Sequence, residues 1–304
     1  MIGSPRMQSE PEIGNPERRG LKKGLYLIPS AFTAANIGMG FYAVMAALRG
    51  FQLIASDVET DFVRAASYLD SAAKAIGWAV LFDMLDGRIA RMTKTTTEIG
   101  IQLDSIADVV TFGVAPAVLA YVWGYGAGLE EGSPLHRLAW FLSFMYLMCG
   151  AFRLARFNVQ ASRPRILAEG TIKVDKKSFV GLPIPVAGGL IAAIIHFAPV
   201  PLVKYETERA AIYSALLMTL VGLLSILMVS TLRFSSFKTL GTRSRSMRTI
   251  ILAVAVGMLI YLYSQYVLLA LVIVYILHGL LSRVVGMFRR RPELSESKMQ
   301  AKET

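Results

Sequence analysis

Long apolar segments recur along this chain of 304 residues, and they constrain its fold more than any other feature. A helix that crosses the hydrocarbon core of a bilayer needs about 20 residues, and eight segments approach that length. They lie at roughly 27–48, 71–91, 99–122, 138–158, 179–200, 210–231, 249–264 and 266–283. Because 54% of the residues are hydrophobic and the mean hydropathy is +0.51, an ordinary soluble domain is excluded. The sequence therefore predicts an all-α, polytopic transmembrane helical bundle with about eight spans.

The first six segments are predicted to form a core, and the last two to add a pair of C-terminal helices. Only the short stretch 263–266 separates that pair, so a tilted or re-entrant hairpin is an alternative. No polar segment is long enough to bury a core of its own, which excludes a separate soluble domain. The predicted parts are a polar N-terminal tail (1–24), a membrane domain (25–238), two further helices (239–285) and a basic tail (286–304).

The distribution of Lys and Arg predicts the orientation of the bundle. If the N-terminus is cytoplasmic, the inner segments hold 26 of the 32 basic residues. The outer segments instead carry the acidic residues Asp57, Glu59, Asp61, Glu130, Glu131, Glu206 and Glu208. An excess of positive charge on the cytoplasmic side is typical of membrane proteins. We therefore expect a cell inner-membrane protein with both termini cytoplasmic, whose net charge of +11 faces lipid headgroups and not nucleic acid.

Four carboxylates occupy positions where apolar helices are expected. Asp83 and Asp86 are three residues apart, so they share one face of a helix. Asp104 and Asp108 are four residues apart and share a face in the same way. The polar stretch 92–99 is short enough for the two helices to run antiparallel and present both pairs to one cavity. Buried like charges repel unless cations neutralise them, and hard oxygen ligands suit Mg²⁺ or Mn²⁺.

Small residues accompany these carboxylates. Gly87 and Ala90 share the face of the first acidic pair, and Gly100 lies one turn before Asp104. Small side chains let a bulky ligand or a second backbone approach closely. Arg91 adds a fixed positive charge that suits a phosphate. The stretch therefore predicts a site for a phosphate-bearing ligand beside bound divalent cations.

Written as a pattern, residues 83–108 read D-x2-D-G-x2-A-R-x8-G-x3-D-x3-D, with every position filled. This pattern resembles the signature of the CDP-alcohol phosphatidyltransferases. The resemblance implies transfer of a phosphatidyl group from CDP-diacylglycerol to an alcohol, with CMP as the leaving group. It assigns Asp83, Asp86 and Asp104 as metal ligands, and Asp108 as both a ligand and the general base. Thr33 and Asn36 stand one turn apart on the first span and are further candidates for contacts with the nucleotide or its phosphates. The full set of such candidates is Thr33, Asn36, Gly87, Ala90, Arg91, Thr97 and Gly100.

The acceptor alcohol is not determined by this signature. Four further stretches, 28–36, 150–158, 179–185 and 228–238, resemble the membrane-embedded CDP-diacylglycerol–serine O-phosphatidyltransferases, and the likeness runs from about residue 26 to 238. That resemblance implies L-serine as the acceptor, phosphatidylserine as the product and a homodimer as the assembly. Glycerol 3-phosphate and inositol phosphate are the alternative acceptors; both are anions that favour a denser basic pocket.

Two arginines are candidates for binding the serine carboxylate. Arg153 and Arg156 are three residues apart on one helix face, and guanidinium groups bind carboxylates well. Asn158 is a candidate for a further polar contact. The alternative interpretation is topogenic, because arginine is common at the inner end of any membrane helix. The same alternative applies to Arg233 and Lys238.

A divalent-cation transporter is the rival from a different functional class. Transport sites more often lie near the bilayer midplane on broken helices, whereas these acids lie toward the basic ends of their spans. A transfer route through a phosphohistidine requires an H-x-K motif. None of the three histidines, His136, His196 and His278, is followed by Lys two residues later. The sequence therefore favours metal-dependent direct displacement.

Overall fold

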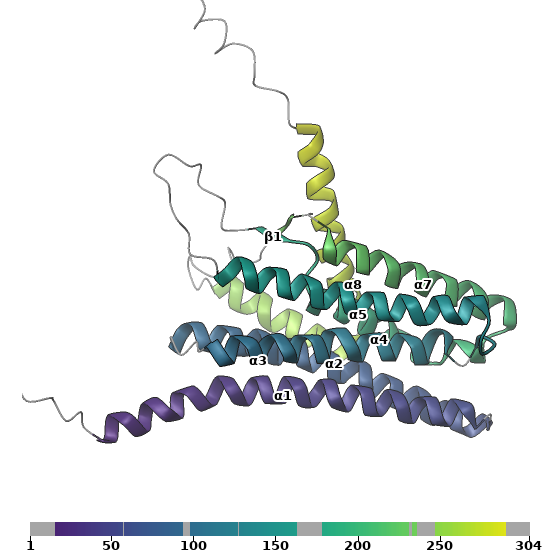
Figure 1. The fold of residues 1–304 in the computed structure, drawn as a ribbon, viewed down its shortest axis with the longest axis horizontal. Helices are drawn as coiled ribbons and strands as arrows, with labels where there is room; N and C mark the ends of the chain where they lie inside the picture. The colour runs from purple at the N-terminus through teal and green to yellow at the C-terminus, as the bar shows by residue number, and fades with distance from the viewer. Residues whose placement is uncertain are drawn as a thin grey trace, which may run out of the picture.

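The computed structural model describes residues 16–56, 58–93, 98–126, 128–162, 178–230, 233–235 and 247–289. Long helices lie side by side along one common direction and form the bulk of the molecule (Figure 1). In chain order the elements are α1 (Pro16–Ala55), α2 (Glu59–Thr93), α3 (Glu98–Asp108), η1 (Val109–Val114), α4 (Ala115–Ala120), η2 (Tyr121–Tyr125), α5 (Pro134–Ser162), β1 (Ser178–Val180), α6 (Ile184–Phe197), η3 (Leu202–Lys204), α7 (Thr207–Val229), β2 (Arg233–Ser235) and α8 (Met247–Arg289).

Six helical segments of the described chain are long and apolar enough to cross a membrane. They are Ala31–Ala55, Ile99–Tyr125, Pro134–Val159, Ile184–Lys204, Thr207–Val229 and Gly257–Gly279. The predicted helical membrane bundle is therefore confirmed, while the count of about eight spans stays a prediction. The charged helix α2 is not among the six, but it has 35 residues, about 52 Å of helix, and packs against α1.

In the C-terminal region, the connection between the last two predicted spans differs from the sequence prediction. The structure has no loop between the last two predicted spans: α8 runs through both and bends at Tyr263, whose φ of −134° and ψ of 44° are not helical. The two parts of α8 run in different directions (Figure 1). The last two predicted spans thus form one kinked helix and not two helices joined by a tight turn.

A small antiparallel ribbon was not predicted. Strand β1 pairs with β2 in the register Ser178 with Ser235 and Val180 with Arg233. The fifth helix consequently starts at Ile184, several residues later than the expected 179. Gly181 has a φ of +81°, and a Cβ there would lie 2.3 Å from the carbonyl oxygen of Met228. Only glycine fits this turn, which keeps the chain out of a helix until Pro183 starts one.

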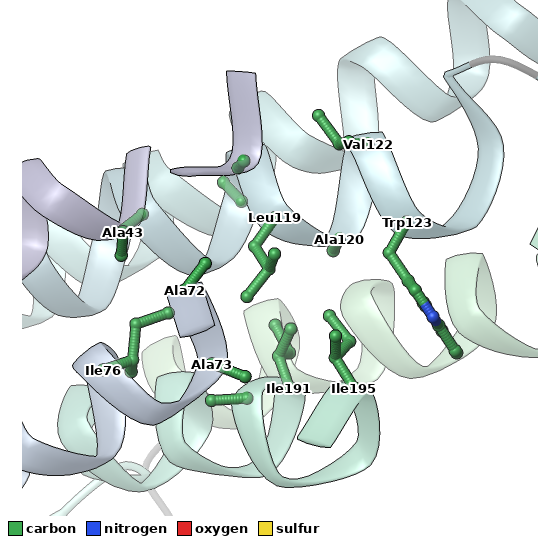
Figure 2. Close-up of a cluster of buried hydrophobic side chains, with 14 of the residues drawn as sticks. Ala43, Ala72, Ala73, Ile76, Leu119, Ala120, Val122, Trp123, Ile191 and Ile195 are labelled. Carbon is green, nitrogen blue, oxygen red and sulfur yellow. The ribbon is translucent and has the colours of Figure 1, made fainter. Parts of the chain in front are cut away.

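The core between α1, α2, α4, η2 and α6 is built largely from small and branched side chains (Figure 2). Its labelled members are Ala43, Ala72, Ala73, Ile76, Leu119, Ala120, Val122, Trp123, Ile191 and Ile195. Hydrophobic burial does not drive helices together in lipid, so association depends on close van der Waals packing, which alanine and glycine permit. This packing holds α2 and α4 against α1 and α6.

Two π-helical turns interrupt the helix that starts at Glu98. The first, η1, follows Asp108 directly, and Pro116 lies in the turn after it. Proline has no N–H to donate, so it leaves the carbonyl of Phe112 without its helical partner. The hydroxyl of the buried Tyr146 on α5 donates to this carbonyl at 3.0 Å. The interruption therefore links the helix of Asp108 to α5.

α1 approaches this helix closely at Gly40. A Cβ on Gly40 would lie 2.4 Å from Thr111 Oγ1 and 2.8 Å from Thr111 Cα. The hydroxyl of Thr111 donates to the carbonyl oxygen of Asn36 at 3.0 Å, one turn earlier on α1. These contacts hold α1 against the segment that follows Asp108.

We predict that Gly40→Ala lowers the melting temperature of the detergent-purified protein, because the added methyl group meets the backbone of Thr111. Overpacking of this kind costs about 1–3 kcal/mol. Gly38→Ala is the matched control, since a Cβ there meets nothing within 4 Å. Replacing that helical glycine should leave stability unchanged or raise it by up to about 1 kcal/mol. Equal melting temperatures for the two variants would contradict the close approach.

Candidate active site

Three of the four predicted carboxylates converge between α2 and α3. One oxygen from each of Asp83, Asp104 and Asp108 lies within 4.8 Å of the other two. Asp83 and Asp104 are half-buried, and Asp108 is buried. The i,i+4 spacing on α3 puts Asp104 and Asp108 on one face, and that face meets the C-terminal part of α2.

Asp86 has a different partner. The hydroxyl of Thr33 on α1 donates to Asp86 Oδ2, and Asp86 is only 6% exposed. Asp86 also interacts electrostatically with Asp104. The fourth carboxylate therefore lies at the same site but is joined to α1, while the other three form the close group.

The donor set fits a divalent cation. Three carboxylates at this separation carry like charges, and a hard cation is the group that neutralises them with oxygen ligands. Asp108 Oδ1 is buried and has no hydrogen-bond partner among the described residues. The close group of Asp83, Asp104 and Asp108 would hold the ion, and Asp86 is the adjacent fourth carboxylate.

Asn36 lies one turn from Thr33 on α1 and is 1% exposed. Neither its side-chain nitrogen nor its oxygen has a hydrogen-bond partner in the described part of the chain. A buried amide without partners is costly, typically about 1–3 kcal/mol, so a bound polar group is the simplest way to satisfy it. The amide is consistent with the predicted contact to the nucleotide or its phosphates.

Arg153 on α5 approaches the acidic group from the other side. Its side chain is buried, with 8% of the residue exposed, and it interacts electrostatically with Asp108. Its Nε has no hydrogen-bond partner within the described residues. Tyr275 on α8 lies in the neighbourhood of Arg153. A buried guanidinium beside the carboxylates is available to an anionic group of a ligand.

The other two predicted acceptor contacts each have a partner in the protein, although the second terminal nitrogen of Arg156, Nη2, is buried and has none among the described residues. Arg156 Nη1 donates to the carbonyl oxygen of Val229 at 3.4 Å, at the C-terminus of α7. Asn158 Nδ2 donates to Ser105 Oγ at 2.8 Å, which joins α5 to α3 beside Asp104. Both contacts tie helices together at this end of the bundle.

The remaining predicted residues are only partly described. Gly87 is half-buried on α2 and Gly100 is exposed on α3. Ala90 and Arg91 belong to α2, but their side chains lie outside the described ones, and so does that of Arg233 in β2. The predictions for Thr97 and Lys238 fall outside the described residues altogether.

Sequence reasoning missed two contributors to this end of the bundle. Thr111 follows Asp104 and Asp108 at helical spacing, so the periodicity of that helix was a signal for it. Tyr275 gave no local signal, because only the path of α8 brings it near Arg153.

This geometry defines a helical membrane protein with a group of carboxylates that could hold a metal ion. The chain matches the family model for CDP-alcohol phosphatidyltransferase over residues 26–221, a segment that contains all four aspartates. The chain belongs to this family, and it is an enzyme of the phosphatidyltransferase class.

Several curated relatives carry the name CDP-diacylglycerol–serine O-phosphatidyltransferase. The protein of that name from Helicobacter pylori (strain ATCC 700392 / 26695) is 33% identical over 221 residues, covering 70% of this chain and 74% of the relative. The one from Saccharomyces cerevisiae is 33% identical over 162 residues, which is 53% of this chain and 54% of the relative. The Methanocaldococcus jannaschii protein is 36% identical over 148 residues, or 49% and 57% of the two chains.

We predict that Asp104→Asn weakens Mn²⁺ binding to the purified protein at least about tenfold, because a neutral amide replaces a charged ligand. Electron paramagnetic resonance of free Mn²⁺ measures the affinity without any need for turnover. Asp61→Asn, at the opposite end of α2, is the control and should bind Mn²⁺ like the wild type. Unchanged affinity in Asp104→Asn would contradict the metal site.

Proposed function

We propose that this enzyme transfers the phosphatidyl group of CDP-diacylglycerol to the hydroxyl of L-serine, giving phosphatidylserine and CMP. The observation that carries the proposal is the group of Asp83, Asp104 and Asp108, with oxygens within 4.8 Å, beside the buried Arg153. The printed names of the relatives support the choice of serine.

The reaction is a direct displacement at phosphorus. The serine oxygen forms a bond to the phosphatidyl phosphorus, and the bond from that phosphorus to the bridging oxygen of CMP breaks. CMP leaves with the bridging oxygen and its electron pair. A divalent ion in the site, Mg²⁺ or Mn²⁺, supplies charge neutralisation for the pyrophosphate and the departing CMP.

The residues of the chain perform the remaining tasks. Asp108 accepts the proton of the serine hydroxyl, and its unpartnered Oδ1 supports this role. Asp83, Asp104 and Asp108 itself would hold the ion, and the adjacent Asp86, hydrogen-bonded to Thr33, would be a fourth ligand. The buried amide of Asn36 donates to the nucleotide or a phosphate oxygen.

Arg153 is the better of the two arginines for the serine carboxylate. It is buried next to Asp108, so a serine bound to it presents its hydroxyl near the base. The contacts of Arg156 with Val229 and of Asn158 with Ser105 favour roles in holding α5, α7 and α3 together. These contacts support Arg153 as the acceptor contact and leave Arg156 and Asn158 structural roles in the proposal.

The orientation and assembly are further parts of the proposal. The excess of Lys and Arg in the inner segments supports a cytoplasmic acidic site, where a soluble acceptor reaches it from the cytosol. CDP-diacylglycerol enters laterally from the bilayer. The resemblance to the family supports a homodimer in the cell inner membrane.

An acceptor panel tests the proposed function. Purified protein in lipid vesicles should convert CDP-diacylglycerol and L-serine to phosphatidylserine and CMP, with turnover abolished by EDTA and restored by Mg²⁺ or Mn²⁺. Faster turnover with glycerol 3-phosphate or inositol phosphate would assign the alternative acceptor. Uptake of Mn²⁺ into vesicles without any CMP release would favour the transporter instead.

The same assay tests the orientation. Inverted inner-membrane vesicles should use added serine directly, whereas sealed right-side-out vesicles should require permeabilisation. Activity in sealed right-side-out vesicles alone would place the site on the outer side.

Two substitutions should separate the role of Asp108 as the base from the role of Arg153 as the contact for the serine carboxylate. Asp108→Asn removes the proton acceptor, so we expect kcat to fall by about 10²- to 10⁴-fold. Arg153→Ala removes a charge-assisted contact worth about 1.5–3 kcal/mol, so KM for serine should rise roughly 10- to 150-fold. The KM for CDP-diacylglycerol should stay nearly unchanged in Arg153→Ala. Equal increases in both KM values would assign Arg153 a structural role.

A further inference from the structure

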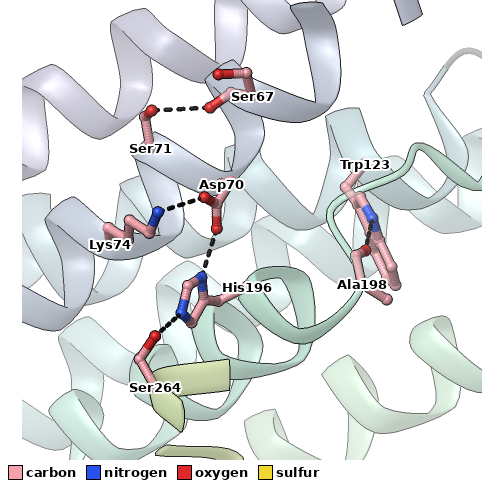
Figure 3. A network of polar contacts seen from close by, with 8 residues as sticks. All are labelled: Ser67, Asp70, Ser71, Lys74, Trp123, His196, Ala198 and Ser264. Carbon is pink, nitrogen blue, oxygen red and sulfur yellow. Dashed lines mark hydrogen bonds and ion pairs between the residues drawn. The ribbon is translucent and has the colours of Figure 1, made fainter. Parts of the chain in front are cut away.

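Polar side chains join three helices in a region well away from the carboxylates (Figure 3). His196 Nδ1 on α6 lies 2.5 Å from Asp70 Oδ1 on α2, and His196 Nε2 lies 2.9 Å from Ser264 Oγ on α8. Asp70 is 13 residues from Asp83 on α2, which is about 20 Å of helix. Both ring nitrogens are engaged within the protein, so this network is complete in itself and does not reach the proposed reaction.

Two other hydrogen bonds join α5 to the helix that carries Asp108. The hydroxyl of Tyr146 donates to the carbonyl oxygen of Phe112 at 3.0 Å, a contact called here the Tyr146 link. Further along α5, Asn158 Nδ2 donates to Ser105 Oγ at 2.8 Å, which is the Asn158 link. Ser105 precedes Asp108 and Phe112 follows it, so the two links lie on either side of this carboxylate.

The two links determine the register of these helices. The later residue on α5 pairs with the earlier residue on the facing helix, so the helices run antiparallel. On α5, Arg153 lies seven residues from the Tyr146 link and five from the Asn158 link. On the facing helix, Asp108 lies four residues and three residues from the same two links. Both residues are therefore a little more than half way from the first link to the second, and the register places them opposite each other.

Packing beside the Tyr146 link supports this register. A Cβ on Gly113 would lie 2.9 Å from Leu147 Cδ1, so the two helices are in direct contact there. Arg153 is two turns from Tyr146 on the same face of α5. Arg153 and Asp108 are 8% and 9% exposed, as expected for side chains between packed helices. Their electrostatic interaction agrees with this placement.

The Tyr146 link is difficult to replace. Pro116, four residues after Phe112, has no N–H to offer the carbonyl of Phe112. Tyr146 itself is 0% exposed, so water does not reach its hydroxyl group. Removing that hydroxyl deprives a buried carbonyl of its donor, and a shift of α5 along the facing helix is then no longer opposed by this bond.

We propose that Tyr146 is a positioning residue for the acceptor. Its hydroxyl, together with the Asn158 link, fixes the register of α5 against the helix of Asp108, and this register holds Arg153 opposite Asp108. The inference rests on the proposed function, in which Arg153 is the contact for the serine carboxylate. It extends that function to a residue about 10 Å of helix away from Arg153, which acts through the position of α5.

Tyr146→Phe tests the inference, because it removes the hydroxyl and keeps the ring. We expect KM for serine to rise about three- to tenfold, the effect of one lost hydrogen bond. KM for CDP-diacylglycerol and the affinity for Mn²⁺ should stay within twofold of wild type, because the carboxylates of the close group are on α2 and α3. The substitution should add little to the serine defect of Arg153→Lys, since residues that act through one another are not additive.

Tyr125→Phe is the matched control. Tyr125 is 1% exposed, and its hydroxyl lies 2.9 Å from Ser143 Oγ, so it also joins α5 to the preceding helical segment. Ser143 is ten residues before Arg153, about 15 Å of helix, and both links beside Asp108 remain in this variant. Its melting temperature should fall like that of Tyr146→Phe, whereas its KM for serine should stay within twofold of wild type.

A double-mutant cycle tests the Asn158 link. Asn158→Ala and Ser105→Ala should raise KM for serine by the same factor, and the double variant should be no worse than either, because all three lose one hydrogen bond. Ser105→Thr keeps the hydroxyl and should retain the wild-type KM. A defect in Asn158→Ala without one in Ser105→Ala would make Asn158 a direct contact of serine and would contradict its part in positioning.

Three results would overturn the inference: a KM for serine in Tyr146→Phe like that of Tyr125→Phe, a joint rise of both substrate KM values, or full additivity with Arg153→Lys. If Tyr146→Phe does not fold, additive effects of Asn158→Ala and Ser105→Ala would still contradict the fixed register. Failure of the proposed function is distinguished by the wild-type protein, which would then not transfer to serine. If it uses another anionic acceptor, the same comparisons apply to that acceptor, and no CMP release with any acceptor would overturn both proposals.

Discussion

The mutual repulsion of closely spaced carboxylates is the constraint on which the rest of this structure depends. Oxygens of Asp83, Asp104 and Asp108 lie within 4.8 Å of one another. At an effective dielectric constant near 20, each pair of charges at that distance repels by about 3–4 kcal/mol. Such a group is stable only when the helices hold it rigidly and a cation neutralises it. The packing around the group supplies the rigidity, and a bound cation would supply the neutralising charge.

Rigidity comes from close helix packing without much help from hydrophobic burial. Gly40 leaves no room for a side chain against Thr111, and Thr111 donates to the carbonyl of Asn36. Pro116 frees the carbonyl of Phe112 for Tyr146, which joins the same helix to α5. The helix that carries Asp108 is therefore fixed on both sides, immediately after the acidic residues. An enzyme that assembles a metal site between helices requires this precision, because small displacements of a ligand weaken the site.

The two ends of the bundle have different tasks. One end collects the carboxylates, Asn36 and Arg153 around a site for charged ligands. The other carries the Asp70–His196–Ser264 network, whose hydrogen bonds are satisfied within the protein. Satisfied polar groups of this kind connect helices that apolar contacts alone would orient poorly in lipid. The bend of α8 at Tyr263 lies next to Ser264, the residue that joins α8 to this network.

The sequence by itself determined the membrane class, the helical bundle and the residues of the acidic group. Hydropathy and segment length are local properties, and the helical period places Asp83 and Asp86, or Asp104 and Asp108, on one face without reference to the rest of the chain. The short turn between the two helices was enough to predict that the pairs meet. The pattern of residues 83–108 also led to the family, which the match over residues 26–221 confirms.

Only the tertiary structure decided which side chains lie beside these carboxylates and which are hydrogen-bonded to other parts of the protein. Spacing treated Arg153 and Arg156 alike, yet one is buried beside Asp108 and the other contacts the carbonyl of Val229. The ribbon of β1 and β2 and the kink of α8 also escaped prediction, because pairing partners and bends depend on contacts between distant segments. Periodicity assigns a residue to a face of a helix, but packing decides what that face meets.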